Sequence, residues 1–279
     1  MFNAMSRAEI WLQDSLDQPL SIEDLARQLG YSASQVRRQF RQCFNMSPRA
    51  YREQRRLERA AVLLSLTQQN IAHIAAQCGY VNHSSFSRAF QRRYQLSPRH
   101  YRQALNDRHQ LKPPLKSFTT DIKQGSPRQA VYMRIYKAAH AISGLGNRKR
   151  HTNHLPCLEA QLGGSIPAVA LPDLLADKVS ALDSTTKPYK LRTDIGLHIE
   201  NQASTDSVAL PVEYRRIDIP SQHYAVTLFD DFSELSDALT ATLCQLHYHQ
   251  SLYHVSGGAP HVLWRKGRLE LKVPLQRLA

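Results

Sequence analysis

Hydrophobic residues recur at helical spacing through about the first hundred positions. One such stretch follows Ser21, a suitable N-cap because Asp24 stands three residues later, where a capping box has its acid. Gly30 is expected to end this helix, since glycine adopts the left-handed conformation past a helix end at least cost. The apolar positions between them share one helix face: Ile22, Leu25, Ala26 and Leu29.

A second helix is predicted to start at Ser32 or Ser34. Its buried positions are Val36, Phe40, Cys43 and Phe44. Two helices separated by a tight glycine turn have the spacing of a helix-turn-helix, in which the second helix enters the major groove of DNA.

The same pattern occurs twice, about fifty positions apart. The stretch "FNMSPRAYR" at residues 44–52 returns as "YQLSPRHYR" at residues 94–102, and "LARQLGY" at 25–31 corresponds to "IAAQCGY" at 74–80. In the second copy Gly79 takes the place of Gly30, and Phe86 and Phe90 take the buried positions. Between the copies, residues 49–65 are good helix formers and predict a rigid helix about 26 Å long. Two such units would contact successive major-groove segments of one duplex.

Beyond residue 128 the helical spacing gives way to short alternating runs, which predict strands. These runs lie at 130–137, 166–171, 194–200, 212–220, 223–230 and 268–275. An amphipathic helix is predicted over 231–249 and a weaker one over 153–162. We therefore expect a multidomain chain, with an all-α tandem helix-turn-helix domain followed by an α+β domain with an antiparallel sheet and packed helices. The expected boundaries are 1–107 for the first domain, 108–128 for a linker with a Pro-Pro pair, and 129–279 for the second domain.

The charge of the chain favours an anionic partner for its first half. The 279 residues carry a formal charge of +13, of which residues 1–107 contribute +7, 108–150 contribute +9 and 151–279 contribute −3. Double-stranded DNA fits this distribution. A solvated arginine face would give the same pattern at one helix, but its occurrence in both copies favours DNA. The exposed candidates are Ser34, Gln35, Arg37, Arg38 and Arg41 in the first copy and His83, Ser84, Ser85, Ser87, Arg88 and Arg92 in the second, with Arg52, Arg55, Arg56 and Arg59 between them as phosphate contacts.

Residues 6–107 resemble the DNA-binding domain of AraC/XylS-type transcription regulators. The second copy has the I-A-x-x-x-G-[FY] opening, the F-S-R-x-F core at 86–90 and the S-P-x-x-[FY]-R close of that family. The resemblance implies seven helices, two recognition helices in adjacent major-groove segments, and action at promoters, which makes RNA polymerase an expected partner. It carries base contacts to Ser34, Arg37 and Arg38 in the first copy and to His83, Ser84, Ser85, Ser87 and Arg88 in the second.

The DNA-binding part comes first in this chain, as in the subgroup of the family that resembles the right-origin-binding protein. Ser34 stands where that subgroup has a large aromatic residue, so the sequence preference of the subgroup does not transfer to this chain.

A carboxylate interrupts the apolar pattern of the last predicted strand. In "LELKVPL" at residues 269–275, Glu270 and Lys272 share one face. If that face is open to water, Glu270 has no special role; if it lines a pocket, the carboxylate would select a cationic or hydrogen-bond-donating ligand. Residues 129–279 resemble the gyrase-inhibitor-like effector-binding domain, which places a glutamate in a cleft for lipophilic cations and other small molecules. Glu270 is the residue that this resemblance carries over, and Tyr224, Phe229 and Trp264 are aromatic candidates beside it.

Other chemistry has little support in the sequence. The four cysteines form no C-x-x-C pair and no secretion leader or membrane span is visible, so we expect a cytoplasmic protein with reduced thiols. His247, His249, His254 and His261 define no closed metal set, and no cofactor fingerprint occurs. The expected function is non-enzymatic: DNA-binding regulation with a small-molecule effector. Two alternatives remain open for residues 129–279, namely a small hydrolase with Glu270 as general base and a protein-interaction module.

Overall fold

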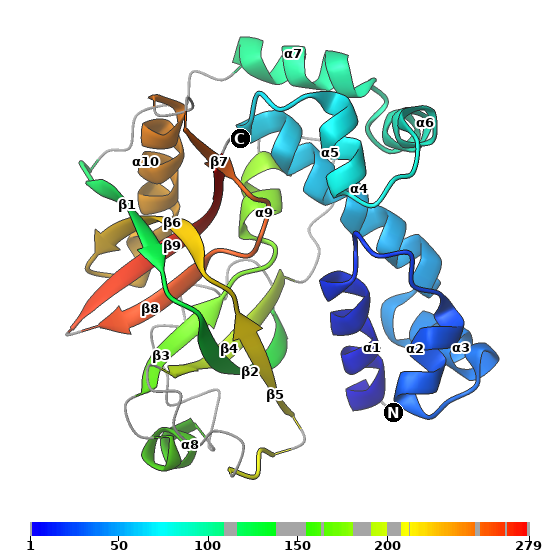
Figure 1. The fold of residues 1–279 in the computed structure, drawn as a ribbon, viewed down its shortest axis with the longest axis horizontal. Helices are drawn as coiled ribbons and strands as arrows, with labels where there is room; N and C mark the ends of the chain where they lie inside the picture. The colour runs from blue at the N-terminus through cyan, green and yellow to red at the C-terminus, as the bar shows by residue number, and fades with distance from the viewer. Residues whose placement is uncertain are drawn as a thin grey trace. The chain divides into compact units, whose positions relative to one another are not determined.

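The chain divides into two compact units, Met1–Gln110 and Leu111–Ala279. A computed structural model describes residues 2–108, 116–137, 155–162, 165–180, 191–199, 208–211, 213–248, 252–265 and 267–277. The first unit is helical, and the second is an antiparallel sheet with helices (Figure 1). The predicted fold class is therefore confirmed.

Seven helices make up the described part of the first unit, the number that the family resemblance implies. They are α1 (Phe2–Asp14), α2 (Ile22–Leu29), α3 (Ala33–Phe44), α4 (Pro48–Leu66), α5 (Ile71–Gln77), α6 (His83–Tyr94) and α7 (Pro98–Arg108). The predicted start of α2 is confirmed, because Ser21 and Asp24 form a capping box. The α3 helix is capped by Ser32 rather than Ser34, and Gln35 completes that second capping box.

Each copy of the repeat has its own hydrophobic core. The first core contains Val36 and Phe40 of α3, packed with α1, α2 and Tyr51. The second contains Phe86 and Phe90 of α6, packed with α5, α7 and the second half of α4. Helix α4 thus contributes its N-terminal part to one core and its C-terminal part to the other, and it runs between the two helix-turn-helix units (Figure 1). Its 19 residues span about 28 Å.

The two repeat glycines predict unequal mutational effects. Both are left-handed, with φ of 71° at Gly30 and 76° at Gly79. A Cβ at Gly30 would meet nothing within 4 Å, whereas one at Gly79 would lie 2.4 Å from the carbonyl oxygen of Leu16. Gly30→Ala should therefore cost only the backbone strain, about 1–2 kcal/mol, and Gly79→Ala about 3 kcal/mol or more. Urea denaturation followed by circular dichroism measures both losses, and equal losses would contradict the clash.

Nine strands form one antiparallel sheet in the described part of the second unit. They are β1 (Thr120–Gly125), β2 (Arg128–Lys137), β3 (Ser165–Ala170), β4 (Leu191–Ile199), β5 (Tyr214–Ile219), β6 (Gln222–Phe229), β7 (Tyr253–Val255), β8 (His261–Arg265) and β9 (Arg268–Arg277). The order across the sheet is β1-β6-β9-β8-β3-β4-β2-β5, with β7 paired to β9. The described helical segments are α8 (Leu155–Gln161), α9 (Leu174–Ser180), a short 3₁₀ turn (Phe232–Glu234) and α10 (Leu235–Tyr248).

The sheet is an internal duplication, in keeping with the pair of related β-α-β-β units that the gyrase-inhibitor-like resemblance implies, although the first unit was poorly legible in the sequence. The strands β2, β3 and β4 with α8 repeat the arrangement of β6, β8 and β9 with α10, and the two halves meet where β3 pairs β8. Each half receives its edge strand from the other half, because β1 pairs β6 and β5 pairs β2. This exchange ties both halves into one continuous sheet.

Several predicted boundaries of the second unit need correction. The expected linker, 108–128, is wrong over its second half, since β1 forms there and pairs with β6 along six residues. Its polar side chains gave no alternation because four of its six residues are exposed. Strands β7 and β8 and helix α9 were not predicted. Positions 109–115 of the linker, and positions 153, 154, 200, 212 and 249 of other predicted segments, lie outside the described residues.

The two faces of the sheet differ in what packs on them. Leu158 of α8 and Leu162, the residue after that helix, pack against Val131 and Leu197. Thr242 of α10 hydrogen-bonds Thr227 on the same face. Strand pairing continues this helix-covered face across the sheet, because paired residues of antiparallel strands point to the same side. The opposite face, called the polar face below, carries these side chains: Arg128, Tyr132, Arg134, Asp194, His198, Arg215, Tyr224, His261, Arg265, Glu270 and Lys272.

Candidate DNA-binding surface and ligand-binding face

Helix α3 exposes all five residues predicted to contact DNA, but three of them already have partners. The Gln35 side chain accepts a hydrogen bond from the Ser32 amide at 2.9 Å. The Ser34 hydroxyl lies 3.1 Å from that of Ser32, and Arg37 pairs with Glu23 at 2.9 Å. Arg38 and Arg41 are exposed and form no ion pair among the residues that the structure describes. These two arginines are therefore the side chains of α3 best placed to reach a base.

Helix α6 presents the corresponding surface in the second copy. His83, Ser84 and Arg88 are exposed, and Ser85 and Ser87 are half-buried. Arg88 has no ion pair in the described part of the chain, whereas Arg92 pairs with Glu53 of α4 at 3.0 Å. Arg88 thus corresponds to Arg38 in two respects: it lies at the equivalent position of the repeat, at an offset of 50, and it is likewise without an ion pair among the described residues.

Three of the α4 arginines suggested as phosphate contacts already have partners within the first unit. Arg52 donates to the carbonyl of Leu20, and Arg56 donates through Nε to the carbonyl of Leu16 at 2.6 Å. Burial lowers the pKa of both guanidinium groups. Arg55 is buried and pairs with Glu58 at 2.7 Å. Arg52 and Arg56 hold the connection between α1 and α2 against α4, so they have a structural role.

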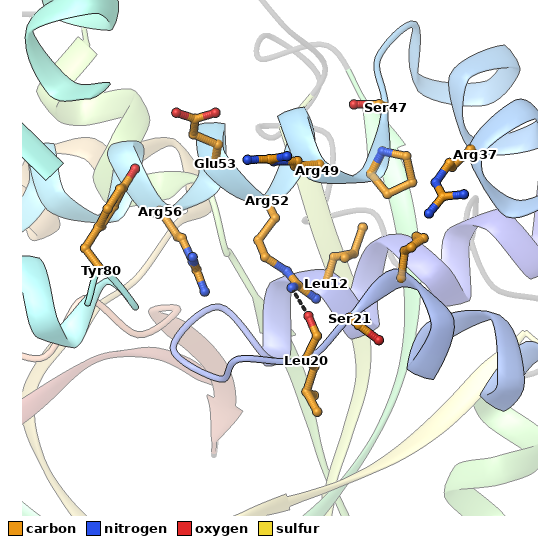
Figure 2. A pocket seen from close by; sticks show the side chains of 12 residues that line it. Leu12, Leu20, Ser21, Arg37, Ser47, Arg49, Arg52, Glu53, Arg56 and Tyr80 are labelled. Atoms are coloured by element: carbon orange, nitrogen blue, oxygen red, sulfur yellow. Dashed lines mark hydrogen bonds between the residues drawn. The ribbon is translucent and has the colours of Figure 1, made fainter. Parts of the chain in front are cut away.

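A groove of about 700 Å³ lies above this connection. Figure 2 shows Arg49, Arg52, Glu53 and Arg56 along its α4 wall, with Ser21 and Leu20 opposite. Arg49 is exposed there and has no ion pair among the described residues. The groove is cationic, and it lies beside the N-termini of α2 and α4.

The repeated "SPRxYR" stretch does the same work in both copies. Its serine caps the following helix, at Ser47 and Ser97. Its tyrosine packs on the recognition helix: Tyr51 lies edge-on to Phe40 at 5.5 Å, and Tyr101 edge-on to Phe90 at 5.2 Å. Its last arginine binds backbone carbonyls at the start of the helix-turn-helix, Arg52 that of Leu20 and Arg102 that of Gln69. The sequence is duplicated because each recognition helix needs its own support.

The structure brings together two of the four predicted ligand-binding residues. Glu270 and Tyr224 lie on the polar face, where Lys272 is between them, with its Nζ 5.8 Å from the centre of the Tyr224 ring. Phe229 and Trp264 both pair with Leu269, so they lie on the helix-covered face and are not part of this site. Trp264 stacks there on Phe232 at 6.0 Å. Alternation along the strands separates neighbours such as Leu228 and Phe229 to opposite faces, and sequence composition does not show which face is which.

A tyrosine between two histidines forms the centre of the polar face, and the sequence gave no sign of it. The Tyr132 hydroxyl lies 2.6 Å from Nε2 of His198 and 3.1 Å from Nδ1 of His261. Burial lowers the pKa of His198 to about 2 and that of His261 to about 4, so both are neutral at pH 7. Burial also raises the pKa of Tyr132 well above its usual value. These residues lie on three strands that are far apart in sequence, and only the sheet order joins them.

Glu270 is buried, at 9% exposure, and already has cationic neighbours. Its carboxylate lies 3.2 Å from Nε of Arg265 and 3.7 Å from Nζ of Lys272. The alternative that Glu270 faces open water is therefore excluded.

Two further features concern only the residues that the structure describes. No group of three or more histidine, cysteine or acidic side chains there could hold a metal ion. No described helix is long and apolar enough to cross a membrane.

Comparison with known proteins identifies the first unit. A family model described as a helix-turn-helix domain matches residues 25–104. The regulatory protein SoxS of Escherichia coli K12 is 40% identical over 95 residues, which cover 34% of this chain and 89% of SoxS. The chain belongs to the AraC-type family of transcription regulators.

Other relatives of this AraC-type regulator match over similar lengths. The right origin-binding protein of E. coli K12 is 36% identical over 108 residues, which cover 38% of this chain and 37% of that protein. A solved AraC-type transcriptional regulator from Chromobacterium violaceum is 29% identical, with a TM-score of 0.35, and covers 37% of this chain and 91% of its own. The sequence matches establish the regulator as a DNA-binding protein, and they extend over little more than a third of its length.

Proposed function

We propose that this regulator reads two adjacent major-groove segments through α3 and α6, with Arg38, Arg41 and Arg88 as the principal base contacts. The observation that carries the proposal is the equivalence of the two helices. Each has a buried phenylalanine face in its own core and an exposed arginine without an ion pair in the described part of the chain. An arginine fork matches O6 and N7 of guanine, so each good contact is worth about 1–3 kcal/mol of discrimination. The remaining predicted residues, such as Ser34 and His83, then supply adaptable contacts.

Binding of the full chain to a selected DNA pool and to random duplex tests this proposal. Arg38→Ala and Arg88→Ala should each lower specific affinity by about 1–3 kcal/mol and relax the preference at a different half of the site, while the salt slope changes by about one charge. Arg7→Ala removes an exposed arginine from α1 and serves as the matched control. Fluorescence anisotropy across a salt series measures all four proteins. Equal affinity of every protein for every duplex would contradict base reading by α3 and α6.

We also propose that the second unit binds a small molecule on its polar face and so alters promoter activation, with RNA polymerase as the partner at the promoter. Support comes from the buried titratable groups gathered there, Tyr132, His198 and His261. Clusters of this kind, with strongly shifted pKa values, mark functional sites more often than structural ones. A shift of melting temperature without turnover of the added compound would support this role, and turnover would favour the hydrolase alternative.

A further inference from the structure

We infer that the polar face takes a small organic anion and not a cation; this inference rests on the ligand-binding role proposed above. The charged side chains of this face are unequal in number. Its central part has five cations and two carboxylates: Arg128, Arg134, Arg215, Arg265 and Lys272 against Asp194 and Glu270. Arg268, at the start of β9, lies on the same face and pairs with Asp230 at 2.9 Å. A cationic ligand would therefore approach a surface that already has a positive excess.

Both carboxylates are already shared between two cations. Asp194 accepts from Nε of Arg134 at 2.6 Å and from Nη2 of Arg215 at 2.8 Å. Glu270 lies between Arg265 and Lys272 at 3.2 and 3.7 Å. A ligand cation that displaced Arg134 or Lys272, whose side chains are only 3% and 11% exposed, would leave it buried without a counterion, which is costly. The cationic preference that the sequence suggested for Glu270 is thus opposed by its surroundings.

Several donors on this face still lack an acceptor. Nε and Nη1 of Arg215 and Nε of Arg128 are buried and have no hydrogen-bond partner within the described part of the chain. Nδ1 of His198, a side chain with 3% exposure, is likewise unpartnered there and is a donor in the tautomer whose Nε2 accepts from Tyr132. One acceptor, Oε2 of Glu270, also has no hydrogen-bond partner there, and its described contact is the ion pair with Arg265. Buried donors in native proteins are normally satisfied. A planar oxyanion supplies the acceptors, because a carboxylate or sulfonate matches the guanidinium fork.

Charges at the margins of this face do not remove the excess. Arg192 pairs with Asp173, and Lys123 pairs with Asp121 at 3.2 Å. His198 and His261 are neutral at pH 7 because burial lowers their pKa values. The positive excess therefore belongs to the arginines and Lys272.

An apolar surface adjoins the cationic groups and indicates the body of the ligand. One buried cluster on this face combines small and branched aliphatic side chains: Ala130, Ile166, Ala168, Ala170, Ile217, Ile219 and Leu263, packed with Tyr132. Three of its members are alanines, Ala130 on β2 and Ala168 and Ala170 on β3, whose side chains fill little volume. The ligand class is therefore an anionic group on a compact apolar body.

Matched pairs of ligands that differ only in charge test the inference. A panel of aromatic and aliphatic carboxylates, such as para-tert-butylbenzoate, is titrated into the full chain by calorimetry beside the corresponding amines, such as para-tert-butylbenzylamine. We expect carboxylates of the panel to bind and the amines not to bind. Arg128→Gln should weaken carboxylate binding at least tenfold, and Arg128→Lys less. The control Arg277→Gln removes an exposed charge from the other face of β9 and should change nothing.

Glu270→Gln separates the two ligand charges directly. The substitution frees Arg265 and Lys272, so it should preserve or tighten carboxylate binding, whereas a cation site would lose its binding. Thermal melting of each variant confirms that it is folded. If the amines bind and Glu270→Gln abolishes that binding, the preference for an anionic ligand is wrong, but the ligand-binding role of the polar face stands. If neither the carboxylates nor the amines bind, as judged by calorimetric heat and by melting temperature, both the anion preference and the ligand-binding role are wrong.

Discussion

Replacing Phe40 by alanine is expected to lower the free energy of unfolding of the first helix-turn-helix by about 3–5 kcal/mol. The Phe40 ring is fully buried in α3, with its centre 4.5 Å from that of Phe44 and 5.5 Å from that of Tyr51. Alanine would leave a cavity that the surrounding α1, α2 and α4 cannot close without moving α3. Since α3 presents Arg38, the same substitution should also abolish reading of one half of the DNA site.

Phe90→Ala provides the matched comparison, because Phe90 is equally buried in the second core and packs on Tyr101, the equivalent of Tyr51. Each variant should lose the half-site of its own copy and retain the other. A Trp264→Phe background leaves Trp11, which packs on the first core, as the only tryptophan, so its fluorescence reports the Phe40 core during urea unfolding. Loss of both half-sites in both variants would show that the two cores do not act separately.

The sequence was sufficient for the first unit because its information is local and is repeated. Caps, glycine turns and apolar spacing lie within a few residues of each other, and each was seen twice, so the boundaries of α2 and α3 were close to those observed. The sequence did not show the structural role of Arg52 and Arg56 in α4, because that role depends on tertiary structure. The carbonyls that bind Arg52 and Arg56 are about 32 and 40 positions away in sequence, and no local pattern indicates them.

The second unit was less accessible because its order comes from pairing between distant strands. Alternation predicted most strands but not β1, whose partner β6 lies about a hundred residues away. Glu270 could be singled out as a charge in an apolar strand. The central groups of the polar face, Tyr132, His198 and His261, come from three other strands, and their register was not predictable from one sequence. The charge of the proposed ligand could therefore be inferred only from the side chains that the folded sheet brings together on the polar face.

Lowering the pH from 7 to 4 is expected to destabilise the second unit by on the order of 3 kcal/mol for each of His198 and His261. Burial is the main cause that holds the pKa of His261 at about 4 and that of His198 at about 2, against about 6.5 when unfolded. Arg128 and Lys272 lower both values further, while Asp194 raises that of His261. Between the folded and unfolded values the unfolded chain binds more protons. Stability is therefore complete above about pH 6.5 and falls as the pH drops towards 4.

Fluorescence of Trp264 in a Trp11→Phe background measures this loss, since Trp264 is then the only tryptophan and lies in the second unit. Carboxylates elsewhere also titrate in this range, so the informative quantity is the difference from variants that cannot gain the proton. His198→Gln and His261→Gln should each be less stable than the parent at pH 7, because they alter the hydrogen bond to Tyr132, but should lose less on acidification. His83→Gln, on exposed α6, is the control and should follow the parent. Parallel curves for all four proteins would mean that neither buried histidine is held neutral by the fold.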